Sequence, residues 1–237
     1  MFEPSGSIRQ SVFEREAEIF LHSYGVSGDD HIAEFAPYES ASTFVAVLDD
    51  LDDVLGVMRI IKPGPAGLKT INESCGQPWN IDGPRAARAV GLEESSTWDV
   101  ATVGVPRGAG RHRFAVTAAL YHGLVLSARQ NGVRSLVMTL DERVRTILTA
   151  TGLITTAFPG ARPGPFCGSK ASTPVFGHCD AMLDAQRRLN PDAYRLIVQG
   201  VGLDAISVPA RQSFILGRSD AERVSPDLDL VGPGVAV

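Results

Sequence analysis

The chain has 237 residues and a formal net charge of -5, from 27 acidic and 22 basic side chains. This acidic balance argues against general nucleic-acid binding, which needs a surplus of basic residues. The first ten residues lack the regions of a signal peptide, and the longest apolar run, residues 114–128, is too short to span a bilayer, so we expect a cytoplasmic protein. The three cysteines are scattered and have no metal-ligand spacing, and we expect no bound metal.

The first half of the chain predicts a helix, a hairpin and a strand. Apolar side chains at helical spacing predict a helix over residues 11–23. Two apolar runs, residues 43–48 and 54–61, flank four aspartates and predict an antiparallel hairpin with an acidic turn. Residues 62–96 are rich in Gly and Pro and predict an irregular excursion. The apolar residues 98–105 predict a further strand.

The second half alternates strands with helices. The patterns predict, in chain order, a helix over 113–131, a buried strand over 134–141, a helix over 142–152, a Pro- and Gly-rich loop over 158–168 and a strand over 172–178. Asn190 and Pro191 predict the start of a last helix, through about residue 199, because Asn caps a helix and Pro suits its first turn. This alternation indicates one α/β domain over residues 1–216, followed by a loose tail over 217–237.

The turn between the strand at 98–105 and the next helix concentrates glycine and positive charge. Three arginines and a histidine fall within residues 107–113, together with Gly108 and Gly110. A helix start offers unpaired N–H groups and the positive end of the helix dipole, so this turn predicts a bound phosphate or another anion. The same residues also suit an ordinary strand-to-helix turn, since no complete phosphate-binding fingerprint is present.

The order of elements, with the R-G-x-G sequence at 107–110, resembles the GNAT acyltransferase superfamily. The resemblance implies a three-layer α/β/α sandwich whose mixed sheet is splayed at its centre. It also implies a pantetheine thioester as donor, either acyl-CoA or an acyl carrier protein. The cofactor contacts that it implies, through backbone N–H groups at the thioester carbonyl and at the phosphates, are Val103, Val105, Arg107, Gly108, Gly110 and Arg111. The spacer before Arg107 is shorter than in the superfamily, which leaves the phosphate contact open.

Short motifs resemble, more narrowly, the acyl-homoserine lactone synthases and related N-acyl amino acid synthases. Gly56 and Arg59 stand at the G-x-x-R-L positions, and Asp99 and Thr102 stand where the E-x-S-R-x-x-V strand has its Glu and Arg. Further positions that match the family are Glu34 and Glu39 in its acidic segment, and Arg15 and Phe20 in its first helix. The resemblance runs from about residue 11 to residue 180.

The implied reaction is transfer of an acyl group, medium or long, to an amine such as an amino acid or another amino-containing metabolite. Asp99 or Glu34 would accept the proton that the amine must lose before it attacks. Arg59 would either bind a substrate carboxylate or form a structural ion pair, for which Asp99 is one candidate partner. Thr102 cannot bind a carboxylate as the family's Arg would, which leaves the acceptor open.

Two alternatives to this branch stay open. Many small acetyltransferases of the superfamily protonate the leaving thiol with a Tyr in the helix that corresponds to residues 143–152, and this chain has none there. That absence favours the acyl-homoserine-lactone-synthase-like branch, but it also suits a GNAT-fold module that binds a ligand or partner without turnover. A small-molecule acetyltransferase is the third possibility. A longer acyl chain would lie among residues that include Leu136, Met138, Ile147, Leu148, Phe158 and Phe166.

Overall fold

The computed structural model describes residues 1–217, without the side chains of residues 108, 109 and 111. The expected tail at 217–237 therefore lies, apart from Gly217, outside the described residues. Seven strands form one mixed sheet in the order β1-β2-β3-β4-β7-β5, and β6 pairs with β7. The strands are β1 (Ser42–Leu48), β2 (Val54–Ile61), β3 (Thr97–Gly104), β4 (Ser135–Asp141), β5 (Thr156–Ala157), β6 (Gly164–Phe166) and β7 (Ser169–His178). The β3–β4 pair is parallel, and the other pairs are antiparallel.

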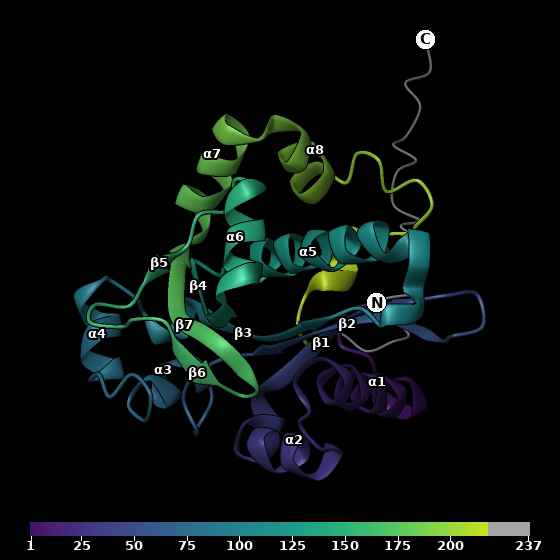
Figure 1. The fold of residues 1–237 in the computed structure, drawn as a ribbon. Helices are drawn as coiled ribbons and strands as arrows, with labels where there is room; N and C mark the ends of the chain where they lie inside the picture. The colour runs from purple at the N-terminus through teal and green to yellow at the C-terminus, as the bar shows by residue number, and fades with distance from the viewer. Residues whose placement is uncertain (218–237) are drawn as a thin grey trace.

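Helices cover both faces of this sheet (Figure 1). One face carries α1 (Gly6–Tyr24), α2 (Gly28–Phe35), the 3-10 helix η1 (Ala36–Ala41), α3 (Lys69–Ser74) and α4 (Gly83–Ala89). The other carries α5 (Arg113–Gln130), α6 (Glu142–Ala150), α7 (Cys179–Leu189), α8 (Pro191–Gln199) and η4 (Arg211–Phe214). The short 3-10 helices η2 (Glu94–Ser96) and η3 (Arg107–His112) precede β3 and α5. The result is the three-layer α/β/α sandwich, with a mixed sheet, that the resemblance implied.

Strand alternation divides the side chains of β3 between the two layers. Trp98 and Val100 pack into the largest apolar cluster together with residues of α5, such as Leu120. Asp99, between them, faces the opposite layer and contacts Thr70 of α3. Successive side chains on a strand point to opposite faces. At this point of β3, one face of the sheet is therefore apolar and the other carries the Asp99 carboxylate.

Gly56 allows α5 to lie close to the sheet. A Cβ atom at this position would lie 2.5 Å from Val116 Cγ1 and 3.2 Å from Leu120 Cδ1, both on α5. Such distances are too short for carbon atoms, so any larger side chain would push α5 away from β2. The glycine of the G-x-x-R motif therefore serves helix-to-sheet packing.

β3 and β4 are paired at their beginnings and separate toward their ends. Three residue pairs join them, and the last is Asp99 with Val137. From there β3 continues through five more residues to Gly104 and β4 through four more to Asp141, with no pairing between the two. An irregularity in the β2–β3 register, between Arg59 and Ile60, lies beside the point of separation. The sheet is therefore open at its centre, as the resemblance implied.

Most predicted elements are present. The first helix begins five residues earlier than expected, the hairpin forms β1 and β2, and the predicted strand at 98–105 is β3. Asn190 caps α8 by accepting a hydrogen bond from the N–H of Ala193 (3.0 Å), and Pro191 is the first residue of this helix. Within the described residues, no helix is long and apolar enough to cross a membrane.

The irregular excursion predicted over 62–96 is wrong, because α3 and α4 lie within it. Pro84 suggested a loop, yet it occupies the first turn of α4, where a missing N–H is harmless. Asp82 caps that helix by accepting from the N–H of Arg85 (3.0 Å). The helices α2 and α7 were not predicted either, and the Pro- and Gly-rich loop contains β6.

Candidate active site

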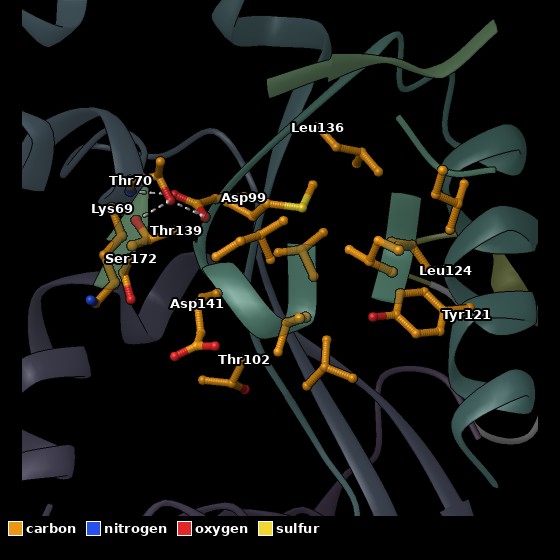
Figure 2. A pocket seen from close by; sticks show the side chains of 18 of the residues that line it. Lys69, Thr70, Asp99, Thr102, Tyr121, Leu124, Leu136, Thr139, Asp141 and Ser172 are labelled. Atoms are coloured by element: carbon orange, nitrogen blue, oxygen red, sulfur yellow. Dashed lines mark hydrogen bonds between the residues drawn. The ribbon is translucent and has the colours of Figure 1, made fainter. Parts of the chain in front are cut away.

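A cavity of about 220 Å³ occupies the gap between β3 and β4. Its walls come from both layers of the sandwich, so it passes through the plane of the sheet (Figure 2). One end, here called the acidic end, is lined by Glu34, Lys69, Thr70, Glu73, Asp99, Thr139 and Asp141. The other, called the apolar end, is lined by residues that include Tyr121, Leu124, Ala128, Leu136, Met138, Val144, Leu148, Met182 and Ile197. Figure 2 shows the labelled polar side chains on one side and Tyr121 and Leu124 of α5 on the other.

Lys69 is the only cation of the acidic end among the described residues, and its charge is matched within the protein. Its side chain is buried, and its Nζ donates to Glu34 Oε1 (2.5 Å) and to Glu73. Burial alone would lower the pKa of this ammonium, but the charges of Glu73 and Glu34 raise it above its usual value. Lys69 is therefore protonated and held at neutral pH, which removes it as a proton acceptor.

Asp99 is fully buried and is held by a single residue of α3. Its Oδ2 accepts a hydrogen bond from the N–H of Thr70 (2.5 Å), and its Oδ1 accepts from the Thr70 hydroxyl (2.9 Å). Burial raises the pKa of Asp99 to about 6, although the Thr70 hydrogen bonds and the Lys69 charge act in the opposite direction. A carboxylate with this pKa is mostly ionised at pH 7 and can accept a proton readily.

Glu73 is a second carboxyl group that can accept a proton near neutral pH, and it was not predicted from the sequence. Burial raises its pKa to about 7, even though Lys69 acts to lower it, and the charges of Glu34 and Asp99 raise it further. Glu34, Glu73 and Asp99 share the one ammonium of Lys69, so two negative charges lack a counter-charge when all three are ionised. Glu73 was not recognised as a candidate because it lies on α3, inside the segment that was predicted to be irregular.

Cys167 also lies at this end, with its Sγ 3.6 Å from Glu34 Oε1. Burial and the charge of Glu34 raise the pKa of the thiol to about 12, so it remains a neutral thiol and not a nucleophile. Within residues 1–217, no group of three or more His, Cys, Asp or Glu side chains has the arrangement of a metal site.

Tyr121 provides a hydroxyl at the apolar end. Figure 2 shows this side chain extending from α5 with its hydroxyl directed toward the cavity. No residue in the described part of the chain forms a hydrogen bond with that hydroxyl. Burial raises the pKa of Tyr121 to about 12, which keeps the group protonated and available as a donor. The sequence reading sought a Tyr in residues 143–152, whereas the structure presents one from a different helix.

Arg59 forms a buried ion pair with Glu16 of α1, and the expected pair with Asp99 is wrong. Its Nε donates to Glu16 Oε1 (3.0 Å) and its Nη2 to Glu16 Oε2 (2.5 Å). Glu39 accepts from Nη1 at 3.2 Å, and the Thr102 hydroxyl donates to Glu16. The prediction was wrong because the side chain of Arg59 faces α1, and the strand pattern alone does not show which helix packs against that strand.

The other predicted residues are divided between the cavity and its surroundings. Glu34, Thr102 and Val103 line the cavity, whereas Arg59, Val105, Arg107 and Gly110 do not. Arg15 pairs with Glu18 on the surface, while Phe20 lines the cavity. Of the residues expected around an acyl chain, Leu136, Met138, Leu148 and Phe166 line it, Ile147 is 63% exposed and Phe158 packs in a separate cluster.

The predicted anion-binding turn forms η3, directly before α5. Gly110 has φ +50° and ψ -131°, a backbone conformation that side chains disfavour, and a Cβ there would meet nothing within 4 Å. The requirement for glycine is thus conformational. Arg107 and Arg113 are exposed beside it, while the Arg111 side chain lies outside the described residues.

Comparison with known proteins finds the fold but no relative by sequence. No protein-family model and no curated protein matches the chain. Among solved structures, FeeM, an N-acyl amino acid synthase from uncultured soil microbes, matches with a TM-score of 0.58 and 13% identity, over 80% of this chain and 94% of that one. This chain shares the fold of such synthases. The acyl-homoserine lactone synthase LasI matches with a TM-score of 0.54 and 16% identity, over 81% of this chain and 93% of that one. BjaI, a CoA-dependent acyl-homoserine lactone synthase with SAM and isopentyl-CoA, matches with a TM-score of 0.53 and 13% identity, over 77% and 82%.

Proposed function

We propose that the protein is a cytoplasmic N-acyltransferase, which moves an acyl group from a pantetheine thioester to an amine. The observation that carries this proposal is the cavity between β3 and β4, which joins buried carboxylates to an apolar chamber. An amine needs a proton acceptor, and an acyl chain needs an apolar space. The fold shared with N-acyl amino acid and acyl-homoserine lactone synthases supports the same reaction class.

The donor would enter from the open end of the gap. β3 separates from β4 toward Gly104, and the turn at η3 and the start of α5 follow directly. The phosphate of coenzyme A, or of a carrier-protein arm, would bind backbone N–H groups from Gly108 to Gly110, where the helix dipole favours an anion. Arg107, Arg111 and Arg113 would add positive charge, which suits either the further phosphate of coenzyme A or an acidic carrier protein.

The size of the cavity favours a medium-length acyl group. An apolar cavity of about 150 Å³ accommodates benzene, with its six carbons, so the whole cavity of about 220 Å³, acidic end included, corresponds to roughly eight or nine carbon atoms. Each buried methylene contributes about 0.8 kcal/mol, and affinity should rise with chain length until the apolar end is full. Met138 and Met182 add flexible side chains to this wall, which adapt to the shape of a chain.

The chemistry follows from the positions of three groups. Glu73 or Asp99 accepts one proton from the ammonium of the acceptor, and the free amine then attacks the thioester carbonyl. The backbone N–H near Val103, on the unpaired edge of β3, would donate to the developing oxyanion. The Tyr121 hydroxyl would donate a proton to the departing thiolate and would regain one from the nitrogen that has attacked, directly or through water. The C–N bond forms as the C–S bond breaks, and the products are an amide and a thiol.

The test is a matrix of thioester donors against amines. Acetyl, hexanoyl, decanoyl and palmitoyl groups are supplied both on coenzyme A and on a carrier protein, and thiol release and amide formation are measured. We expect hexanoyl or decanoyl to give the highest kcat/KM. A clear preference for acetyl would favour the alternative of a small-molecule acetyltransferase. Donor binding without thiol release would favour a non-catalytic module.

The variant Leu124→Trp sharpens this test, because Leu124 points into the apolar end (Figure 2). The larger ring should occupy space that the acyl chain needs, so decanoyl turnover should fall while acetyl turnover is retained. Retained acetyl turnover also shows that the variant is folded. Equal loss with both donors would contradict the assignment of this end to the acyl chain.

A further inference from the structure

Among the residues whose side chains the structure describes, the acidic end contains no cation that is free to bind the carboxylate of a substrate. Lys69, its one cation, is 5% exposed and donates to both Glu34 and Glu73. The other cation on the cavity wall, Arg129, belongs to the last turn of α5, in the opposite layer of the sandwich. A carboxylate entering beside Lys69 would have to displace a glutamate that is already in contact with it.

Arg59 cannot serve this purpose either. Its side chain is 1% exposed, is absent from the cavity wall, and uses Nε and Nη2 on Glu16 and Nη1 on Glu39 and Ser42. Its guanidinium carbon lies 4.3 to 4.9 Å from the ring centroids of Phe35, Phe44 and Phe13, which enclose it. Lys69 and Arg59, the buried Lys and Arg of this layer in the described part of the chain, are therefore both neutralised from within the protein.

Carboxylates outnumber the single ammonium. Glu34, Glu73, Asp99 and Asp141 line the same end of the cavity as Lys69. Burial without sufficient counter-charge raises the pKa of Glu73 to about 7 and of Asp99 to about 6. A ligand ammonium would supply the missing positive charge, whereas a ligand carboxylate would be repelled and would lose its hydration without a partner.

We infer that the acceptor is a primary amine that carries no carboxylate beside its amino group, such as an arylalkylamine or a diamine, and not an α-amino acid. This inference rests on the proposed acyltransferase function and narrows it to one class of acceptor. The amine binds as its ammonium among the carboxylates and passes one proton to Glu73 or Asp99. It attacks the thioester carbonyl, and its second departing proton ends on the thiol.

The experiment compares acceptors that differ in the carboxylate alone. Tyramine is paired with tyrosine and its methyl ester, and phenethylamine with phenylalanine, with decanoyl and acetyl thioesters as donors. We expect the amine of each pair to exceed the amino acid in kcat/KM by about tenfold or more, and the methyl ester to behave like the amine. An amino acid that equals or exceeds its amine would overturn the inference and leave the acyltransferase function standing. No amide from any acceptor with any donor would overturn both.

A variant links the preference to the charge of the site. Glu34→Gln removes one of the two carboxylates that hold Lys69, so the ammonium becomes available to a substrate carboxylate and the preference for amines should narrow. Glu14→Gln is the matched control. It removes the same charge, but Glu14 lies on the exposed face of α1, where it contacts Gln10. An unchanged preference in Glu34→Gln, with a folded protein by thermal melting, would contradict the inference.

Discussion

Thr70 binds both oxygens of the Asp99 carboxylate, through its backbone N–H at 2.5 Å and its hydroxyl at 2.9 Å. The two residues lie on different elements, α3 and β3, and are 29 positions apart in the chain. This two-point contact fixes the direction of the carboxylate in a layer where it has no direct cationic partner. If Asp99 accepts the proton of the substrate, as proposed, this contact keeps the carboxylate in one orientation toward it.

Replacing Asp99 with Asn should lower turnover by about 10²-fold and leave donor affinity unchanged, because general-base contributions are typically of this size. The folded-state pKa of Asp99 lies above its ordinary value of 3.8, at about 6. Its ionisation therefore costs folding stability above about pH 6, and this cost disappears below about pH 4. Thermal melting should show that Asp99→Asn is no less stable than the native protein at pH 8. Normal turnover with normal stability would exclude a role for Asp99.

The pH profile distinguishes Glu73 from Asp99. A base must be deprotonated to act, so the rate should fall as pH drops through the pKa of the residue that accepts the proton. If Glu73 is that residue, half of the maximal kcat/KM, which reports the free enzyme, is reached near pH 7, and Glu73→Gln both removes this step and depresses kcat/KM. If the pH profile of Glu73→Gln keeps its midpoint near 7, the proton is accepted by another residue.

Tyr121→Phe tests the proton donor at the apolar end. The change removes a hydroxyl that has no hydrogen-bond partner within residues 1–217, so the fold should tolerate it. If the hydroxyl donates to the departing thiolate, kcat should fall by about 10- to 100-fold with little change in KM. Activity should recover with a donor whose leaving thiol is more acidic. If kcat is unaltered with every donor, the Tyr121 hydroxyl does not donate the proton, and the side chain only contributes to packing.

Gly110→Val tests the turn before α5. The φ of +50° strains any larger side chain by about 1–3 kcal/mol, so the turn should shift and the KM for the thioester donor should rise. Gly132→Val is the matched control, because Gly132 has φ +66°, also has free space around it, and lies at the other end of α5. Equal KM values for the two variants, both folded, would contradict the proposal that this turn binds the phosphate of the donor.

Acid stability should depend on Glu16. Burial acts to raise the pKa of this carboxyl, but contacts with His31 and Arg59 lower it to about 2, against an ordinary value of 4.5. A group with a depressed folded-state pKa contributes stability above pH 4.5, and this contribution is lost as the pH falls toward 2. Glu16→Gln should be strongly destabilised at pH 7, by about 3–5 kcal/mol, because it leaves Arg59 buried with a single exposed carboxylate as partner. Melting temperatures between pH 2 and 7 provide the measurement, and a pH dependence equal to that of the native protein would contradict this role.

Local features of the sequence predicted the elements that depend on local physics. The hairpin follows from alternating apolar runs around an acidic turn, and α8 follows from the cap at Asn190. Contacts between distant segments were not predictable in the same way. Arg59 could face several carboxylates, and the choice of Glu16, 43 residues away, depends on where α1 packs. Glu73 was missed because α3 is a single short helix that begins after a Gly- and Pro-rich stretch, which has no periodic pattern long enough to recognise.

The short seam between β3 and β4 has a mechanical consequence. Within the described chain, three residue pairs connect a sheet made of β1, β2 and β3 to another made of β4, β7, β5 and β6. Each part has its own complete hydrogen-bond ladder, so a rotation about the seam from Thr97 to Asp99 would disturb few backbone bonds. We expect the seam to act as a hinge, with α3, which contacts both β3 and β4, as the main side-chain link across it. The angle between the two parts would then set the width of the gap, and a thicker ligand would move the outermost strands, β1 and β5, relative to each other.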